Sequence, residues 1–188
     1  LAEIELILAT TTLLGKLNFK DFKVRINERR ILKAMASYSG FTEEQYDQVF
    51  IILDKMDKIG WDGVKAELIE SGYPEANVEK YVTMFDEMEK AEDALAYLSE
   101  KLSGVLEEDV IENLRTIRTS VEATAASQFQ LVFDPTLVRG MSYYTGTIFE
   151  IEMAEFGSSV AGGGRYDKMI GKFTGKDTPA CGFSIGFE

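Results

Sequence analysis

The sequence predicts an α+β protein in which two separated parts of the chain build one β-sheet and an all-α subdomain is inserted between them. Three observations support this prediction. Strand-like runs occur near the start and again after residue 126, helical periodicity fills residues 41–125, and the charge balance changes at the same boundaries. We therefore expect sheet-domain segments at residues 1–40 and 126–188, separated by a helical insertion domain at residues 41–125.

The first sheet-domain segment is expected to form a helix, a strand and a second helix. Residues 2–14 carry apolar side chains at helical spacing. Residues 21–26 alternate apolar with basic side chains, which is typical of a half-buried strand. Asn27 is then expected to cap a helix over residues 28–38.

The insertion is expected to contain four to six short helices. Thr42 and Gln45 have the spacing of a capping box, and Pro74 is suited to starting a later helix. Residues 61–69 form another short helical pattern between them. We expect the aromatic residues of this segment to lie in its core.

The second sheet-domain segment is expected to return to β-structure. Residues 129–133 are apolar and β-prone, and residues 145–153 alternate as a strand does. Residues 158–164 are interpreted as the hairpin partner of that strand. A short helix over residues 167–173 and a last strand over residues 180–187 complete the prediction.

Charge and composition limit the functions open to this chain. Residues 41–125 contain 21 acidic and 8 basic side chains, which disfavours broad electrostatic binding of nucleic acid through that part. The chain has no histidine and one cysteine, so its own residues cannot form an imidazole-based triad, a zinc site or a disulfide. No run approaches the roughly 18 apolar residues of a membrane span. We expect a cytoplasmic protein with no membrane partner and no metal site of its own.

Residues 134–188 are the candidate functional region, because they contain 10 of the 16 glycines. Gly162, Gly163 and Gly164 form an unbroken run in a strand-like context, where a small ligand such as an amino acid could lie directly on the backbone. A flexible turn is the alternative. The run is not a phosphate-binding loop, because no Gly-Lys-Ser/Thr follows at the required spacing.

Other residues of this region are candidates for ligand binding, and each also has a purely structural explanation. The Arg139 guanidinium suits a phosphate or carboxylate, but the tetrapeptide around it by itself favours a surface or structural ion pair. Tyr143 and Tyr144 would face opposite sides of a strand, so that one could meet a ligand, or both could be packing residues. Cys181 is expected to be a core thiol. The spacing of the remaining acidic candidates, Asp134 and Asp167, does not show that they meet.

Three motifs in this region resemble those of histidyl-tRNA synthetase, a class II aminoacyl-tRNA synthetase. Residues 137–146 (LVRGMSYYTG) resemble a histidine-specific motif, with Ser142 where the family usually has Asp. Residues 162–167 (GGGRYD) resemble the glycine-rich strand beneath the substrate, followed by Lys168 where Gly is common. Residues 178–188 (TPACGFSIGFE) resemble the start of class II motif 3, and residues 26–32 resemble the segment ahead of the insertion domain.

The resemblance implies an antiparallel-sheet catalytic domain that activates histidine with ATP and Mg²⁺ and passes it to tRNA(His). Arg139 would be the catalytic residue at the α-phosphate, and Gly182 and Gly186 would lie beneath the nucleotide. The histidine pocket would be formed by Tyr143, Tyr144, Tyr166 and the glycines Gly162, Gly163 and Gly164. The family resemblance also implies a homodimer.

Two alternative functions remain open beside this resemblance, and the chain is expected to be a fragment. A synthetase paralogue that senses histidine as the regulatory subunit of ATP phosphoribosyltransferase is the first alternative. The second treats the acidic insertion as an independent interaction domain; tRNA contact there would use a few basic residues such as Arg115 and Arg118. Because motifs 1 and 2 are absent, we expect these 188 residues to be a fragment without aminoacylation activity of its own.

Overall fold

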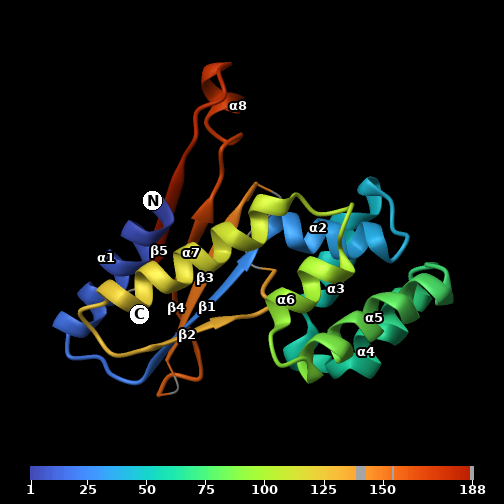
Figure 1. The fold of residues 1–188 in the computed structure, drawn as a ribbon, viewed down its shortest axis with the longest axis horizontal. Helices are drawn as coiled ribbons and strands as arrows, with labels where there is room; N and C mark the ends of the chain where they lie inside the picture. Colours follow the sequence, from blue (N-terminus) through green and yellow to red (C-terminus); the bar gives the residue numbers. More distant parts are fainter. Residues whose placement is uncertain (139–142, 154, 187–188) are drawn as a thin grey trace. The chain divides into compact units, whose positions relative to one another are not determined.

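The computed structural model describes residues 1–138, 143–153 and 155–186. The described chain divides into two compact units (Figure 1). Unit 1 comprises Leu1–Arg29 and Glu112–Glu188, and unit 2 comprises Arg30–Ile111. The limits of both units fall inside helices, whereas the sequence prediction placed domain boundaries at residues 40/41 and 125/126. The assignment of the two parts as catalytic and insertion domains stays a prediction.

Unit 1 is built on a five-stranded sheet in the order β2-β1-β3-β4-β5. Its strands and helices are α1 (Ala2–Lys16), β1 (Phe22–Glu28), most of α7 (Glu108–Thr124), β2 (Gln130–Phe133), β3 (Thr147–Met153), β4 (Ser158–Arg165), α8 (Gly171–Thr174) and β5 (Cys181–Ile185). The predicted α+β class is therefore confirmed, and β3 and β4 form the expected antiparallel pair.

The sheet is mixed, so the predicted antiparallel sheet is confirmed only in part: three of the four strand pairs in the described residues are antiparallel and one is parallel. β1 pairs with β2 in parallel and with β3 in antiparallel orientation. A parallel pair needs a long connection between its strands. In this chain the whole of unit 2 lies between β1 and β2 in the sequence, which provides that connection.

The register of β1 on β3 separates the sheet into an apolar and a polar face. Val24 lies opposite Ile151 and Ile26 opposite Phe149, and all four side chains are fully or almost fully buried. The neighbouring position on β1, Arg25, lies opposite Glu150 and therefore points to the other face. Arg25 is only 8% exposed, so the predicted half-buried strand is in fact covered on both faces.

Two sequence predictions at the ends of elements need correction. Asn27 does not cap a helix, because it lies within β1, and α2 (Arg29–Tyr38) begins two residues later. The Asn27 side-chain oxygen instead accepts a hydrogen bond from the Glu28 amide at 2.8 Å, and Asn27 Nδ2 donates to the Leu137 carbonyl at 2.9 Å. The final helix predicted over residues 167–173 shortens to α8 at Gly171–Thr174.

Unit 2 is entirely helical apart from its connections. After α2 it contains the 3₁₀ turn η1 (Glu43–Gln45) and helices α3 (Tyr46–Leu53), α4 (Met56–Glu70), α5 (Glu75–Lys90), α6 (Ala94–Lys101) and the start of α7 (Glu108–Thr124). Gly60 has φ 66°, which breaks α4 just before Trp61, where the sequence predicted a helix start. Tyr81 and Phe85 pack in its core, as expected. Within the residues described, no helix is long and apolar enough to cross a membrane.

Candidate functional site

Three tyrosine rings gather beside the end of β4. The ring centroids of Tyr143 and Tyr144 are 4.5 Å apart, and Tyr166 lies 6.1 Å from the first and 6.4 Å from the second. The prediction that Tyr143 and Tyr144 face opposite sides of a strand is wrong, because both precede the start of β3 at Thr147. The structure thus brings together all three tyrosines that the family resemblance assigned to one pocket.

Glycines make room for these rings. A Cβ atom on Gly182 would lie 2.4 Å from the Tyr166 hydroxyl, and one on Gly164 would lie 3.0 Å from the Tyr144 ring. Gly182 and Gly164 are paired across β4 and β5, so they form one bare patch of backbone under two tyrosines. A side chain at Gly182 would displace the Tyr166 ring. A side chain at Gly164 would overlap the Thr147 carbonyl oxygen, 2.7 Å from its Cβ, as well as the Tyr144 ring.

The third glycine of the run has a different role from its neighbours. Alternation along β4 places Gly163 on the face opposite Gly162 and Gly164. A Cβ on Gly163 would lie 2.2 Å from the Gly182 carbonyl oxygen and 2.7 Å from the Phe183 Cα, both backbone atoms of β5. Gly163 therefore permits close pairing of the two strands and does not face the tyrosines.

An ion-pair and hydrogen-bond network holds Tyr166 from both sides. Arg165 binds the buried carboxylate of Glu3 in α1, and its Nη1 donates to Asp167 Oδ1 at 2.9 Å. The same Asp167 oxygen accepts from the Ala180 amide at 3.1 Å, and the Tyr166 amide donates to the Ala180 carbonyl at 2.8 Å. These bonds connect α1, the end of β4 and the start of β5 around one tyrosine.

The residue that leads into β3 joins the same network. The Thr145 amide donates to the Arg165 carbonyl at 2.8 Å, and its hydroxyl accepts from the Asp167 amide at 3.1 Å. The end of the segment resembling the histidine-specific motif and the GGGRYD strand are therefore bonded directly to each other.

A second polar cluster lies on the polar face of β1 and was not identified from the sequence. Arg25 Nε donates to Asp134 Oδ2 at 2.7 Å, and its Nη1 contacts Glu150 at 3.5 Å and also Glu152. Together with the Asn27 bond to Leu137, this cluster attaches the segment after β2 to β1. Alternating Lys23 and Arg25 in the sequence suggested a solvated face, and nothing in that pattern predicts three acidic partners.

Burial and neighbouring charges shift several pKa values in this region. Burial, followed by the adjacent Tyr143, raises the pKa of Tyr144 above its usual range. Burial, followed by the nearby Glu3, raises the pKa of Cys181 to about 11, so its thiol is protonated at neutral pH. The bond to Glu3 raises the pKa of Arg165. The Tyr144 hydroxyl is therefore neutral at neutral pH.

The remaining predicted site residues are only partly placed. Arg139 lies outside the described residues. Gly186 follows β5, and its amide donates to the Val160 carbonyl at 2.9 Å. Asp134 and Asp167 are each bound by a different arginine, Arg25 and Arg165.

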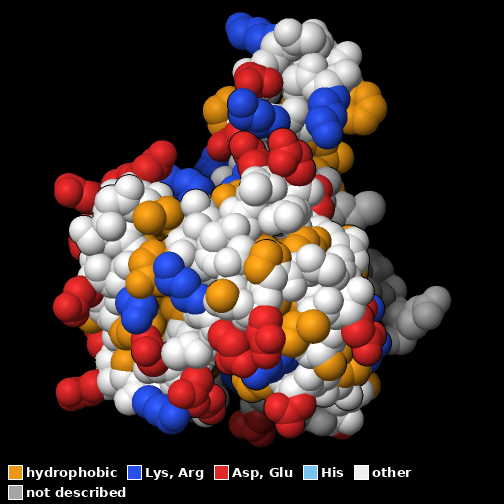
Figure 2. All heavy atoms as spheres, turned by 90° about the vertical axis from the view of Figure 1, so that its right-hand side faces the viewer, with side chains coloured by type: hydrophobic (Ala, Val, Ile, Leu, Met, Phe, Trp, Pro, Cys, Tyr) orange, Lys and Arg blue, Asp and Glu red, His pale blue; other side chains and the backbone are white. Residues whose placement is uncertain are grey.

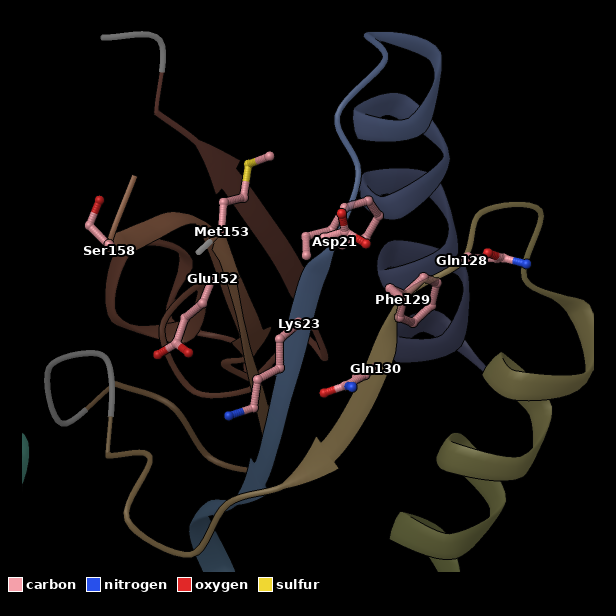
Figure 3. A pocket seen from close by; sticks show the side chains of 10 residues that line it. Asp21, Lys23, Gln128, Phe129, Gln130, Glu152, Met153 and Ser158 are labelled. Atoms are coloured by element: carbon pink, nitrogen blue, oxygen red, sulfur yellow. The ribbon is translucent and has the colours of Figure 1, made fainter. Parts of the chain in front are cut away.

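A hollow of about 650 Å³ lies at the other end of the sheet and contains none of the predicted site residues (Figure 3). It is lined by residues at the starts of β1 and β2 and by the β3–β4 hairpin: Asp21, Phe22, Lys23, Gln128, Phe129, Gln130, Glu152, Met153, Gly157 and Ser158. Ser158 begins β4, whereas the tyrosines gather where that strand ends. The hollow is therefore separate from the tyrosine site.

One sequence family matches the whole chain that forms this site. Residues 1–188 match the family described as histidyl-tRNA synthetase. The chain belongs to this family. A histidine–tRNA ligase from Leifsonia xyli is 45% identical over 192 residues, which cover all of this chain and 44% of that protein. The chain thus spans a little under half the length of this curated relative.

Solved structures agree with the family assignment. The crystal structure of histidyl-tRNA synthetase from a Nostoc species superposes with a TM-score of 0.80 at 28% identity, covering 99% of this chain and 45% of that one. A structure from Bacillus halodurans, titled as an ATP phosphoribosyltransferase regulatory subunit/histidyl-tRNA synthetase, has a TM-score of 0.77 at 22% identity, over 98% of this chain and 47% of that one. The second similarity shows the shared fold alone.

Proposed function

We propose that the longer protein containing this chain is a histidine–tRNA ligase. In the first reaction a carboxylate oxygen of histidine attacks the α-phosphorus of ATP, and pyrophosphate leaves. In the second, a hydroxyl at the 3′ end of tRNA(His) attacks the activated carbonyl, and AMP leaves. The observation that carries the proposal is the gathering of Tyr143, Tyr144 and Tyr166 beside Gly164 and Gly182. The 45% identity to a ligase favours this function over a histidine-sensing regulatory subunit.

In this proposal the chain supplies recognition more than proton transfer. The hydroxyls of Tyr144 and Tyr166 would bond the imidazole or amino group of histidine, because a tyrosine hydroxyl can both donate and accept a hydrogen bond. Gly162 and Gly164 would let the substrate lie against the backbone. Arg139 would stabilise charge developing on the α-phosphate. Gly182 and Gly186 would lie beneath the nucleotide, Mg²⁺ would arrive with ATP, and the working protein would be a homodimer.

ATP–pyrophosphate exchange by the full-length protein tests this proposal, with each of the twenty amino acids in turn. We expect exchange with histidine alone and its loss in Arg139→Ala. Tyr166→Phe removes one neutral hydrogen bond, so the KM for histidine should rise by about 3- to 10-fold. Tyr97→Phe is the matched control, because the Tyr97 hydroxyl binds Glu87 in unit 2. Exchange with another amino acid would contradict the proposal, and histidine binding without exchange would indicate the regulatory subunit.

A further inference from the structure

The segment between Tyr166 and Ala180 forms a tip beyond the ends of β4 and β5, with α8 at its extremity (Figure 1). Residues 172–179 are all exposed. Three lysines and one acidic residue lie in residues 168–178, in a chain whose net charge is −12. The space-filling view shows basic and apolar side chains together at the tip, with acidic side chains beside them (Figure 2).

The lysines of the tip are largely free to meet a partner. Lys168 lies 3.9 Å from Asp177 and is 74% exposed. Among the described residues, Lys172 and Lys176 form no ion pair, and both are exposed. Phe173 lies between them and is 82% exposed. An aromatic ring flanked by unpaired lysines is the arrangement that binds single-stranded nucleic acid, with the ring stacking on a base and the lysines contacting phosphates.

The base of the tip is fixed to the tyrosine site. Tyr166 and Ala180 are bonded by a backbone hydrogen bond, and Asp167 binds the Ala180 amide as well. The Gly175 amide donates to the Gly171 carbonyl at 2.8 Å, and Gly175 adopts φ 72°, which closes α8 into a compact turn. The tip therefore starts and ends directly beside Tyr166 and Gly182, where the proposed reaction takes place.

We propose that this tip, residues 168–178, is a contact surface for the phosphate backbone and an unstacked base of the RNA substrate near its reactive end. The inference rests on the proposed function and adds the surface that receives the RNA. Charge favours this assignment, because unit 2 contains 19 acidic and 8 basic side chains, which disfavours broad electrostatic binding of RNA through that unit. The tip adds positive charge beside the site.

The test compares two assays on the full-length protein. Lys172→Glu/Lys176→Glu should raise the KM for tRNA in aminoacylation about tenfold or more. The slope of log KM against log salt concentration should fall by about two, because two phosphate contacts are lost. ATP–pyrophosphate exchange, which needs no tRNA, should remain unchanged. Lys20→Glu/Lys58→Glu is the charge-matched control, since both lysines are exposed and lie elsewhere. If the wild-type protein catalyses no histidine-dependent exchange, the proposed function itself fails.

Variants of Phe173 separate base stacking from apolar docking. Phe173→Ala and Phe173→Leu should both raise the KM for tRNA, by about 5-fold or more, because neither side chain can stack on a base. Full activity in Phe173→Leu with loss in Phe173→Ala would overturn the proposal and indicate an apolar protein contact. Equal KM values for tRNA in the lysine pair and its control would overturn it as well. The urea unfolding midpoints of both Phe173 variants should equal that of the wild type, because this side chain is exposed.

Discussion

At the scale of single residues, the three consecutive glycines of β4 are not equivalent. A Cβ on Gly164 would meet the Thr147 carbonyl oxygen and the Tyr144 ring, whereas a Cβ on Gly163 would meet Gly182 and Phe183 of β5. A sequence motif presents them as one unit, but the alternation of a strand assigns neighbours to opposite faces. Substitution should therefore separate the structural Gly163 from the glycines of the proposed histidine pocket.

Gly163→Ala should destabilise the protein by about 1–3 kcal/mol, because its Cβ would overlap backbone atoms that cannot move aside easily. Gly162→Ala is the control on the same strand, where the nearest contact would be 3.3 Å from the Phe149 carbonyl oxygen. Its effect on stability should be clearly smaller. Urea unfolding of both variants measures the difference, and equal losses would contradict this account of Gly163.

Cys181 should react slowly with alkylating reagents, because the thiolate is the reactive form and its pKa is raised to about 11. The rate with iodoacetamide should increase about tenfold per pH unit up to about pH 10. An ordinary cysteine, with a pKa of about 8.5, levels off near pH 9. The same chain unfolded in urea is the control. A plateau near pH 9 in the folded protein would show that burial does not control this thiol.

At the scale of secondary-structure elements, α1 packs against β4 and β5 and is joined to the sheet by Glu3 and Arg165. Burial is the largest single influence on the pKa of Glu3 and acts to raise it. The hydrogen bond and the charge of Arg165, together with a backbone hydrogen bond, outweigh burial in sum and lower the pKa. A lowered pKa means that this contribution to stability is complete above the unfolded-state pKa of about 4.3. It is lost as the pH falls through the lower folded-state value.

Glu3→Gln should lower the free energy of unfolding at pH 7 by up to about 3 kcal/mol, since it leaves Arg165 without its buried partner. Stability of the variant should also depend less on pH below about 5. Glu79→Gln removes an exposed partner of Lys65 and should change stability less. Chemical unfolding at several pH values measures both. A pH profile identical to wild type would contradict the role of Glu3.

At the scale of the whole molecule, charge is distributed unevenly between the compact units. Unit 2 carries a net charge of −11, and unit 1 carries −1. Repulsion among like charges weakens a compact state, and salt screens it over distances of about 10 Å. The two units should therefore respond differently to ionic strength.

Hydrogen exchange followed by mass spectrometry should show this difference within one sample. Raising the salt concentration from about 0.02 M to about 0.5 M should slow exchange more in the helices of unit 2 than in the strands of unit 1. The sheet serves as the internal control. An equal or larger gain of protection in unit 1 would show that charge repulsion does not limit the stability of unit 2.

Much of the fold follows from local patterns in the chain. The apolar alternation of β1 and β3, and the helical spacing around Tyr81 and Phe85, predicted these elements close to their observed limits. The motifs in residues 137–146, 162–167 and 178–188 were sufficient to predict the family, which the comparison over residues 1–188 confirms. Periodicity and motifs are local properties, so they can be read without knowing the contacts.

Only the tertiary structure could decide which residues meet. Asn27 and Arg25 were expected at a helix cap and on a solvated face, yet they bind Leu137 and Asp134, more than 100 positions along the chain. The parallel pairing of β1 with β2 and the gathering of three tyrosines were decided in the same way. A polar side chain in a strand forms its bonds with whichever segment the sheet places beside it, and one-dimensional spacing does not contain that placement.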